Sequence, residues 1–485
     1  MLVVISLVFF CYLVVLFSLA IWTRKGTQSL SGYFLADKKL PPSVVAFSTN
    51  ATGESGWLLL GLTGMGYAVG VQAFWVVAGE VIGISLVWLL LARRIKHLGD
   101  ESDSITVPDL LSAKFVDPQN LIRKVSVLVI LVMVGTYVSA QMVATGKAFS
   151  TFTGMDYSLA VVFGATIIIA YTLIGGFKAV AFTDLVQGIL MLGGLILVPA
   201  VAITSLGGVE EMLGGLHDID AYLLDPFRPS ESGYSVWIPI LSFLAIGLPF
   251  LGVPQLTVRF MSAVSEASIR TAGSISIIVT FLFGTGAVLT GMAGRVLVPE
   301  LEDSETVFPV LAAELFPDAV TGLLMVVVLA AIMSTVDSLL LLASSAVVRD
   351  FLQKIRGSGR DDSDLARYGK ITTLVIGVMA VVFALMESPL IFWLVLFAWS
   401  GLGAAFGPVI VCLFYYPKLT LYGALASISG GFLTSVIWVV SPLKSALNDL
   451  YEMIPGFIVG LLLAILVSQF TQSTNVSPTK AGKPS

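Results

Sequence analysis

Long apolar stretches separated by short polar segments recur along the whole of the 485-residue chain. A helix rises about 1.5 Å per residue, so stretches of this length can cross a hydrocarbon core of about 30 Å. We predict an all-helical, polytopic membrane protein with about thirteen transmembrane helices. Their approximate ranges are 2–22, 42–69, 73–92, 125–149, 157–177, 180–206, 236–258, 271–295, 319–347, 371–387, 390–416, 419–440 and 454–470.

The second predicted span, 42–69, is interrupted by the polar, glycine-containing segment from Ser48 to Trp57. A break in a membrane helix leaves backbone groups unpaired, so it persists only where it faces protein, a cavity or an ion. The segment carries Glu54, and an acid at this depth is destabilising by about 2.5 to 3.5 kcal/mol on insertion scales. We therefore interpret Glu54 as a functional residue. The alternative is a tolerated kink whose carboxylate reaches the interface.

The seventh predicted span, 236–258, contains a second interruption. It includes Gly247, Pro249, Gly252 and Pro254 and lies five spans after the first interrupted span. Interruptions at corresponding places in two halves indicate a transporter built from inverted repeats, with a binding site near the bilayer midplane. The alternative is that Gly and Pro are simply frequent in membrane helices.

The two interruptions divide the chain into two five-helix repeats, formed by spans two to six and seven to eleven. The predicted segments are a first helix with a cytoplasmic loop (1–41), the first repeat (42–206), an extracellular loop (207–235), the second repeat (236–416), and two additional helices with a cytoplasmic tail (417–485). No separate soluble domain is expected.

Composition and charge agree with a membrane protein and orient it. Charged residues make up 12% of the chain and the mean hydropathy is +0.97, whereas soluble domains contain about 25% charged residues. Of the 26 lysines and arginines, 22 fall on one side of the predicted spans, and basic loops stay cytoplasmic. We expect an integral protein of the plasma (inner) membrane, with its N-terminus outside and its C-terminus in the cytoplasm. The net charge of −5 gives no indication of nucleic-acid binding.

The ninth predicted span carries another group of polar side chains. Ser334, Asp337 and Ser338 share one helical face by their i, i+3 and i+4 spacing, and Thr335 lies beside it. Hydroxyl and carboxylate oxygens suit a hard cation. Because no His or Cys accompanies them, zinc and copper are disfavoured, and no cofactor is expected.

The remaining candidates for chemistry do not form a catalytic set. Cys11 and Cys412 lie in apolar runs, which argues against a disulfide framework or a thiolate metal site. His97 and His217 fall in polar loops on opposite sides of the predicted membrane. An enzyme is therefore not expected.

Two polar residues in or near the spans leave alternatives open. Asp184 follows the Gly175-Gly176 turn, near the cytoplasmic start of the sixth span. It either pairs with Lys178 at the interface or belongs to an ion pathway. Gln141, in the middle of the fourth span, is either a solute contact or a packing residue.

Six groups of residues, spread over nearly all the predicted spans, occur in the order and register of a known family. They are Ser55-Gly56-Trp57-Leu58-Leu59 with Gly61-Leu62, Thr106-Val107-Pro108-Asp109, Tyr171 to Gln187, Pro254 with Arg259-Phe260-Met261, Met333-Ser334-Thr335, and Ala398 to Pro408. In these residues the chain resembles the sodium:solute symporter family and, within it, most of all the bacterial sodium/proline symporters. The resemblance implies a five-plus-five inverted repeat of the leucine-transporter type.

The resemblance also implies ion sites. A sodium site would lie between the second and ninth spans, with the coupling ion held by backbone carbonyl groups and two hydroxyls. Its ligands would be the carbonyl groups of Ala51, Glu54 and Ala331 and the hydroxyls of Ser334 and Thr335. A second ion site, found in some members, would use the positions of Asp184, Asp337 and Ser338.

The chain departs from the sodium/proline symporters where the solute is expected. Those proteins have Asp in place of Gly53, an apolar residue in place of Glu54, and Trp and Tyr in place of Ile246 and Phe250. The loss of polar groups predicts a small solute with apolar character. The residues expected to contact it are Ser55, Gly56, Trp57, Gln141, Ile246, Phe250 and Pro254.

We therefore predict sodium-coupled uptake of a small organic solute by alternating access, with a proline-like amino acid as the first candidate. The expected partners are the solute, sodium and the lipid bilayer, with no nucleic acid. One alternative is a proton-coupled symporter of another small solute, such as a monocarboxylate, with Glu54 or Asp337 as the proton carrier. Another is a membrane sensor or a channel.

Overall fold

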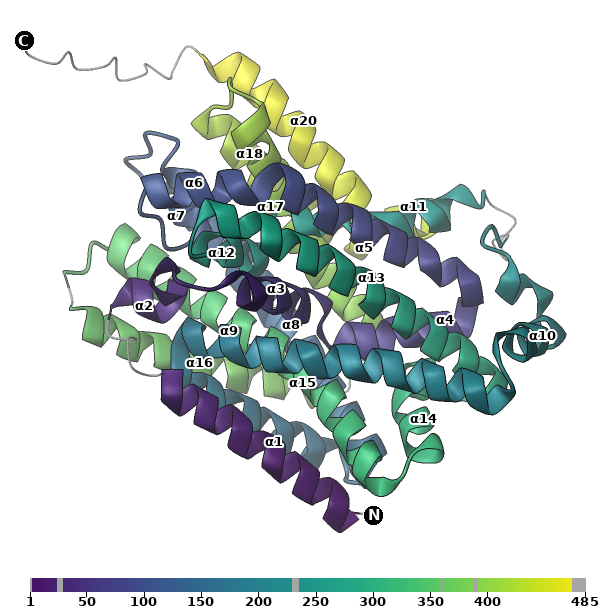
Figure 1. Cartoon of the computed structure of the whole chain (residues 1–485). Coiled ribbons are helices and arrows are strands. Elements are labelled where there is room, and N and C mark those ends of the chain that lie inside the picture. Colours follow the sequence, from purple (N-terminus) through teal and green to yellow (C-terminus); the bar gives the residue numbers. More distant parts are fainter. Residues whose placement is uncertain (1, 24–28, 229–234, 360, 387–390, 473–485) are drawn as a thin grey trace, which may run out of the picture.

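The computed structural model describes residues 2–23, 29–228, 235–359, 361–386 and 391–472, and these residues form helices without a β-strand (Figure 1). The first half contains α1 (Leu2–Thr23), α2 (Leu30–Leu35), η1 (Ala36–Lys38), α3 (Pro42–Trp57), η2 (Leu58–Leu62), α4 (Thr63–Val69), η3 (Gly70–Ala73), α5 (Phe74–Leu86), η4 (Val87–Ala92), α6 (Arg93–Glu101), α7 (Val107–Ser112), α8 (Leu121–Thr153), α9 (Tyr157–Leu206), α10 (Val209–Ile219) and η5 (Ala221–Leu224). The second half contains α11 (Trp237–Ala245), η6 (Leu248–Leu251), α12 (Pro254–Ser262), α13 (Glu266–Leu297), η7 (Ser304–Thr306), α14 (Val307–Leu315), α15 (Asp318–Ser345), η8 (Ala346–Ile355), α16 (Asp362–Ala384), α17 (Ile391–Tyr415), α18 (Leu421–Val440), α19 (Leu443–Ala446) and α20 (Met453–Thr471).

Ten helices in the described ranges are long and apolar enough to cross a membrane, and the bent pair α11 and α12 raises this number to eleven. This confirms an all-helical membrane protein. Two of the ten stretches, Pro42–Glu101 and Tyr157–Leu206, contain 60 and 50 residues. If straight, they would be about 90 and 75 Å long, far more than one bilayer crossing. Each contains a glycine with positive φ, Gly70 in the first and Gly176 in the second.

The helix α3 lies at the centre of the molecule. It packs against α9, α13 and α15, and Figure 1 shows it between these longer helices. The N-terminal helix α1 covers α9 and α15 from outside, while α18 and α20 pack together and against α17 on the opposite side (Figure 1). The residues of α3 are therefore shielded from lipid, as a polar break requires.

Both interruptions predicted from the sequence are present. In α3 the backbone leaves the helical conformation at Ser55, with φ 57° and ψ −173°, a region that residues other than glycine rarely adopt. The π-helical segment η2 follows at once. In the second case, α11 and α12 are separated by a bend of 44°. Both bends thus interrupt the regular backbone geometry of a membrane helix.

The segment 207–235, predicted as an extracellular loop, also contains helical structure. The amphipathic helix α10 buries Met212 and Leu216 against the membrane helices and packs on α13 and α9. Residues 229–234 of that loop, residues 24–28 of the first cytoplasmic loop and residues 473–485 of the predicted tail lie outside the described residues. The boundaries of the two repeats remain predictions.

Candidate functional site

A cluster of oxygen atoms lies where the broken helix α3 meets α15. The Ser334 hydroxyl donates to the Ala51 carbonyl at 2.9 Å and to the Ala331 carbonyl at 3.1 Å. The Thr335 hydroxyl donates to the carbonyls of Thr52 at 3.1 Å and Ala331 at 3.3 Å. All these residues are buried. The cluster holds carbonyl and hydroxyl oxygens at distances from which a hard cation can draw several ligands at once.

Four of the five sodium ligands predicted from the family resemblance therefore lie together. They are the carbonyl groups of Ala51 and Ala331 and the hydroxyls of Ser334 and Thr335. The carbonyl of the fifth, Glu54, accepts a hydrogen bond from the Leu58 amide across the break. The Thr52 carbonyl was not predicted and joins the cluster through Thr335.

The residues predicted for a second ion site also meet, but with an arginine among them. The Arg259 guanidinium donates to the Asp184 carboxylate at 3.0 Å and also to the Ser338 hydroxyl. The side chains of Arg259 and Asp184 are 1% and 0% exposed. Asp184 thus forms its ion pair with Arg259 from α12, and Lys178 is not its partner in the described residues.

Asp337, the third residue predicted for this second site, has its own partners. Its carboxylate accepts from the Tyr171 hydroxyl and, at 3.2 Å, from the Ser338 hydroxyl. Tyr171 also donates to the Met333 carbonyl at 3.1 Å. Together with Thr52, whose hydroxyl is 3.0 Å from that of Ser338, these residues join α3, α9, α12 and α15 in one buried polar network.

On the other side of the break, a small cavity of about 10 Å³ lies against Glu54. This volume has room for about one water molecule, so the site is closed in this state. Of the predicted solute contacts, Ser55, Trp57 and Ile246 line it. The residues that complete its wall are Gly53, Glu54, Glu80, Tyr137, Val395, Leu396 and Trp399.

The other predicted solute contacts lie behind this wall. Gln141 accepts a hydrogen bond from the Gly56 amide at 3.1 Å, so it fixes the broken backbone. A Cβ on Gly56 would lie 2.7 Å from Ile332, which leaves space for glycine alone. The Phe250 ring packs edge-on against Trp399, with ring centroids 5.2 Å apart. Pro254 is buried at the start of α12.

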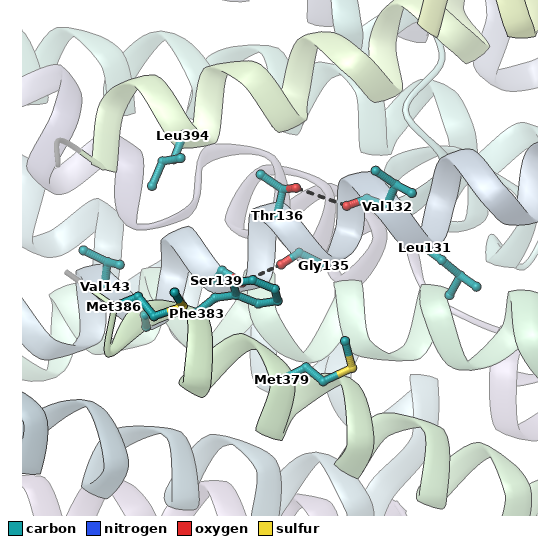
Figure 2. A pocket seen from close by; sticks show the side chains of 11 residues that line it. Leu131, Val132, Gly135, Thr136, Ser139, Val143, Met379, Phe383, Met386 and Leu394 are labelled. Carbon is teal, nitrogen blue, oxygen red and sulfur yellow. Dashed lines mark hydrogen bonds between the residues drawn. The ribbon is translucent and has the colours of Figure 1, made fainter. Parts of the chain in front are cut away.

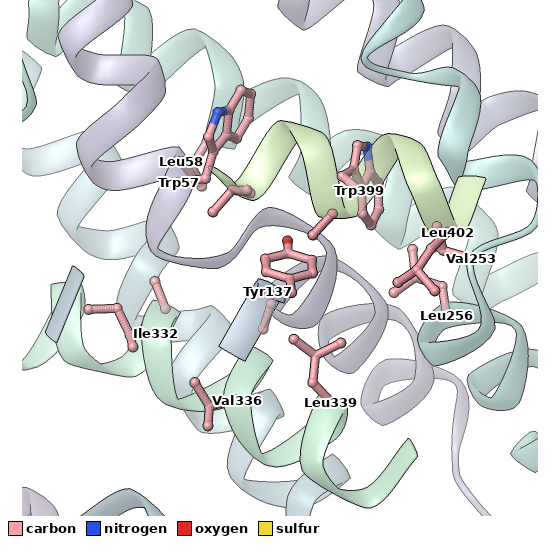
Figure 3. Close-up of a cluster of buried hydrophobic side chains, with 14 of the residues drawn as sticks. Trp57, Leu58, Tyr137, Val253, Leu256, Ile332, Val336, Leu339, Trp399 and Leu402 are labelled. Atoms are coloured by element: carbon pink, nitrogen blue, oxygen red, sulfur yellow. The ribbon is translucent and has the colours of Figure 1, made fainter. Parts of the chain in front are cut away.

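Five wall residues were missed by the sequence prediction, and the sequence contains a signal for one of them. Glu80 is an acid within the third predicted span, so the reasoning that singled out Glu54 applies to it equally. The other four, Tyr137, Val395, Leu396 and Trp399, resemble any aromatic or aliphatic residue of a buried membrane helix. Figure 3 shows the Tyr137 ring between α15 and the segment of Trp57, with its hydroxyl directed away from α15.

A larger groove of about 590 Å³ opens elsewhere, between α8, α16 and α17 (Figure 2). Its walls are mainly apolar, and several, such as Phe383 and Met386, are exposed. The Thr136 and Ser139 hydroxyls in it donate to carbonyl groups of their own helix at 3.1 and 2.8 Å. This groove offers no free polar group from these two residues and shares no residue with the cavity at Glu54.

Comparison with known proteins identifies one family and relatives that match nearly the whole chain. The model of the sodium:solute symporter family matches residues 33–431. The high-affinity proline transporter PutP of Bacillus subtilis (strain 168) is 38% identical over 461 residues, which cover 94% of this chain and 96% of that protein. The osmoregulated proline transporter OpuE of the same organism is 35% identical, covering 95% and 94%. A sodium/proline symporter of Staphylococcus aureus is 34% identical, covering 95% and 91%.

Solved structures share the fold at lower identity. A Na+-coupled sialic acid symporter, in a substrate-bound outward-open state, superimposes with a TM-score of 0.81 at 18% identity and covers 96% of this chain and 98% of that one. Mhp1, a nucleobase-cation-symport-1 family transporter in a closed conformation, gives a TM-score of 0.56 at 15% identity, covering 92% and 95%.

Proposed function

Because the chain belongs to the sodium:solute symporter family, we propose that it drives the uptake of a small organic solute with the inward sodium gradient, by alternating access. The matched relatives are transporters, and three of them are named for proline. A proline-like amino acid is therefore the first candidate solute. Sodium is the coupling ion.

The observation that carries this proposal is the oxygen cluster between α3 and α15. Ser334 and Thr335 both reach carbonyl groups at the broken segment of α3. A cation bound there would hold α3 against α15 and would order the backbone that continues into Ser55 and Trp57, at the solute cavity. Bound sodium would then favour solute binding, and bound solute would favour sodium binding, by the same free energy, typically about 1 to 3 kcal/mol.

One sodium ion per cycle is supported by Arg259. Its guanidinium lies among the oxygens of Asp184 and Ser338, where the second ion site of some family members was predicted. A buried guanidinium supplies the positive charge that Asp184 requires. We propose that this internal cation replaces a second sodium ion.

The same proposal includes the arrangement in the membrane. Two of the eleven candidate helices contain 60 and 50 residues, and each has a glycine with positive φ, Gly70 and Gly176. If each of the two crosses the membrane twice, the chain has thirteen crossings. Spans two to six and seven to eleven would form a five-plus-five inverted repeat of the leucine-transporter type, with the interrupted spans in corresponding places. The basic residues favour a plasma-membrane protein with an outside N-terminus and a cytoplasmic C-terminus.

Proton coupling is the second candidate, because Glu54 and Glu80 are buried acids at the same cavity. Uptake of radiolabelled proline, small amines and monocarboxylates into proteoliposomes, with imposed sodium or proton gradients, separates the two. We expect accumulation under a sodium gradient and none under a proton gradient alone. Accumulation that follows the proton gradient without sodium would replace the first candidate by the second. Saturable, gradient-driven uptake also distinguishes a transporter from a channel.

A further inference from the structure

Two buried carboxylates at the solute cavity are not used by the sodium site. Glu54 on α3 and Glu80 on α5 are 1% and 2% exposed, and both line the cavity. Neither carboxylate oxygen of Glu54, nor Oε2 of Glu80, has a hydrogen-bond partner in the described residues. Two neighbouring carboxylates in a dry site require a cation or a proton close to them. The side chains of this cavity provide no such partner.

The rest of the wall indicates what kind of cation fits. Trp57, Tyr137 and Trp399 contribute aromatic rings, whose faces attract organic cations. Ile246, Val395 and Leu396 contribute aliphatic surface, and no Lys or Arg is present in the wall. A carboxylate on the solute would find two negative charges and no basic side chain. An ammonium group would find charge-assisted hydrogen bonds to both acids.

A metal cation suits this wall less well. Hard cations draw several oxygen ligands at once, but apart from the two acids the wall offers mainly rings and aliphatic groups. The sodium cluster, in contrast, is formed by carbonyl and hydroxyl groups of Ala51, Ala331, Ser334 and Thr335. The two sides of the α3 break thus offer different chemistry, one for an inorganic and one for an organic cation.

We propose that Glu54 and Glu80 together bind the cationic nitrogen of the solute, and that the site prefers a small aliphatic amine without a carboxylate over a zwitterionic amino acid. The ammonium group lies between the two acids and the hydrocarbon part against Ile246, Val395 and Leu396. This inference rests on the proposed function and specifies its substrate class. A proline-like solute shares the ammonium group and is accepted, but its carboxylate weakens binding.

Proline and pyrrolidine test this preference, because they share the same ring and cationic nitrogen and differ in the carboxylate. Their binding to the purified full-length protein in sodium is measured by calorimetry. We expect pyrrolidine to bind about 10-fold more tightly than proline, or more, because the proline carboxylate would lie near two acids without a basic side chain to pair with it. Glu54→Gln and Glu80→Gln should each weaken pyrrolidine binding by about 10-fold and narrow the difference between the two ligands.

Two further variants control the test. Glu314→Gln removes an exposed acid on α14, far from the wall, and should leave both affinities unchanged. Glu54→Asp keeps the charge and should retain the preference for pyrrolidine, which separates loss of charge from loss of folding. Tighter binding of proline than of pyrrolidine, or unchanged pyrrolidine binding in both amide variants, would overturn the inference.

The binding experiment with proline and pyrrolidine can be interpreted independently of the transport assay. If sodium drives proline into proteoliposomes but pyrrolidine does not bind, sodium-coupled uptake stands and the amine preference is wrong. If no solute accumulates with sodium, the proposed function fails, while the binding data still decide the role of the two acids. If pyrrolidine does not bind and the amide variants flatten the pH dependence of uptake, the acids carry protons.

Discussion

Arg259 places a guanidinium group among buried oxygens of three other helices. It donates to Ser48 at 2.7 Å and to Asp184 at 3.0 Å, and it also contacts Thr52 and Ser338. These groups join α3, α9 and α15, so the arginine supplies a fixed positive charge beside the proposed sodium site.

Replacement of this cation by a neutral group gives a prediction. Arg259→Gln leaves Asp184 as an unpaired buried charge, which should destabilise the protein by about 3 to 5 kcal/mol. Sodium should then fill the free position, so the Hill coefficient for sodium in uptake should rise above one. The neutral double variant Arg259→Gln, Asp184→Asn should recover stability with a Hill coefficient of one. Unchanged sodium cooperativity in a folded Arg259→Gln variant would contradict the single-ion proposal.

We predict that the solute selectivity depends on Ile246 and Phe250. The Trp399 indole donates to the Ile246 carbonyl at 3.0 Å, and its ring packs against Phe250. The double variant Ile246→Trp, Phe250→Tyr restores two hydrogen-bonding groups of the sodium/proline symporters and should shift the preference toward proline by about 10-fold. Competition between proline and pyrrolidine for uptake measures this shift in preference. Ile189→Trp, on a side chain 52% exposed, is the control, and an equal shift in that control would refute the explanation.

Part of this site could be predicted from the sequence. The family resemblance singled out Ser334 and Thr335 beside a polar break, and their hydroxyls do reach carbonyl groups of that break, Ala51 from Ser334 and Thr52 from Thr335. Glu80 was accessible to the same reasoning but lies in an otherwise apolar span. The pair of Arg259 with Asp184 could not be predicted, because the two residues are 75 positions apart and come together only where α12 and α9 both pack on α3.

Among the elements, α9 depends on a single backbone position. Gly176 has φ 61° and ψ −172°, and this conformation divides the 50-residue helix into two parts. The flanking sequence predicted a tight turn here because Gly175 and Gly176 separate two apolar runs. The interruptions of α3 and α11–α12 were equally visible, since glycine, proline and polar residues mark them. The count of thirteen spans stays a prediction, because long continuous helices conceal where the chain reverses.

The turn in α9 can be tested by adding a methyl group. A Cβ on Gly176 would lie 3.0 Å from the Tyr33 ring, at a φ that alanine rarely adopts. Gly176→Ala should therefore destabilise the protein by about 1 to 3 kcal/mol. A Cβ on Gly193, in the same helix, would have no atom within 4 Å. Gly193→Ala should therefore be neutral or stabilise the protein by up to about 1 kcal/mol. Equal thermal unfolding of the two purified variants would disprove the special role of Gly176.

At the scale of the whole molecule, α8 is tied at both ends by buried or half-buried ion pairs. Near its start, Arg123 contacts Asp109 at 2.6 Å and Asp350 at 2.7 Å. Near its end, Lys147 contacts Asp303 at 2.9 Å and Glu305 at 2.7 Å. These pairs lie about 36 Å apart along the helix, which is about the thickness of a bilayer. They hold α8 against neighbouring segments at both of its ends.

The ion pairs of Asp109 should be insensitive to pH in the physiological range. Burial raises the pKa of the Asp109 carboxyl, but the nearby Arg349 and Arg123 outweigh this effect and hold the pKa below its ordinary value. A carboxyl with a lowered pKa contributes stability that is present above its unfolded pKa of about 4 and is lost as the pH falls through its pKa in the folded protein. We expect the ion pairs of Asp109 with Arg123 and Arg349 to remain intact between pH 6 and pH 8.

Loss of Arg123 tests whether the cluster of Arg123, Asp109 and Asp350 closes this end of the protein. Arg123→Gln leaves Asp109 and Asp350 without their shared partner, at an energetic cost of about 3 kcal/mol or more. A cysteine is placed at the buried Ser104 in a background without other cysteines. Its thiol should be labelled several-fold faster in the Arg123→Gln variant, because this end of the protein opens. Arg356→Gln, on an exposed side chain, should leave the rate unchanged. A labelling rate that is the same in both variants would exclude a closing role for the cluster.

Sodium binding to the purified protein tests the central claim most directly, because it requires no knowledge of the solute. Binding of radioactive sodium should be saturable, and potassium should not displace it. The double variant Ser334→Ala, Thr335→Ala should lose two of the oxygen ligands between α3 and α15 and weaken sodium binding by at least about 10-fold. Ser344→Ala, nine residues beyond Thr335 on the same helix, should bind sodium as the unaltered protein does. Unchanged sodium affinity in the folded double variant would contradict the account.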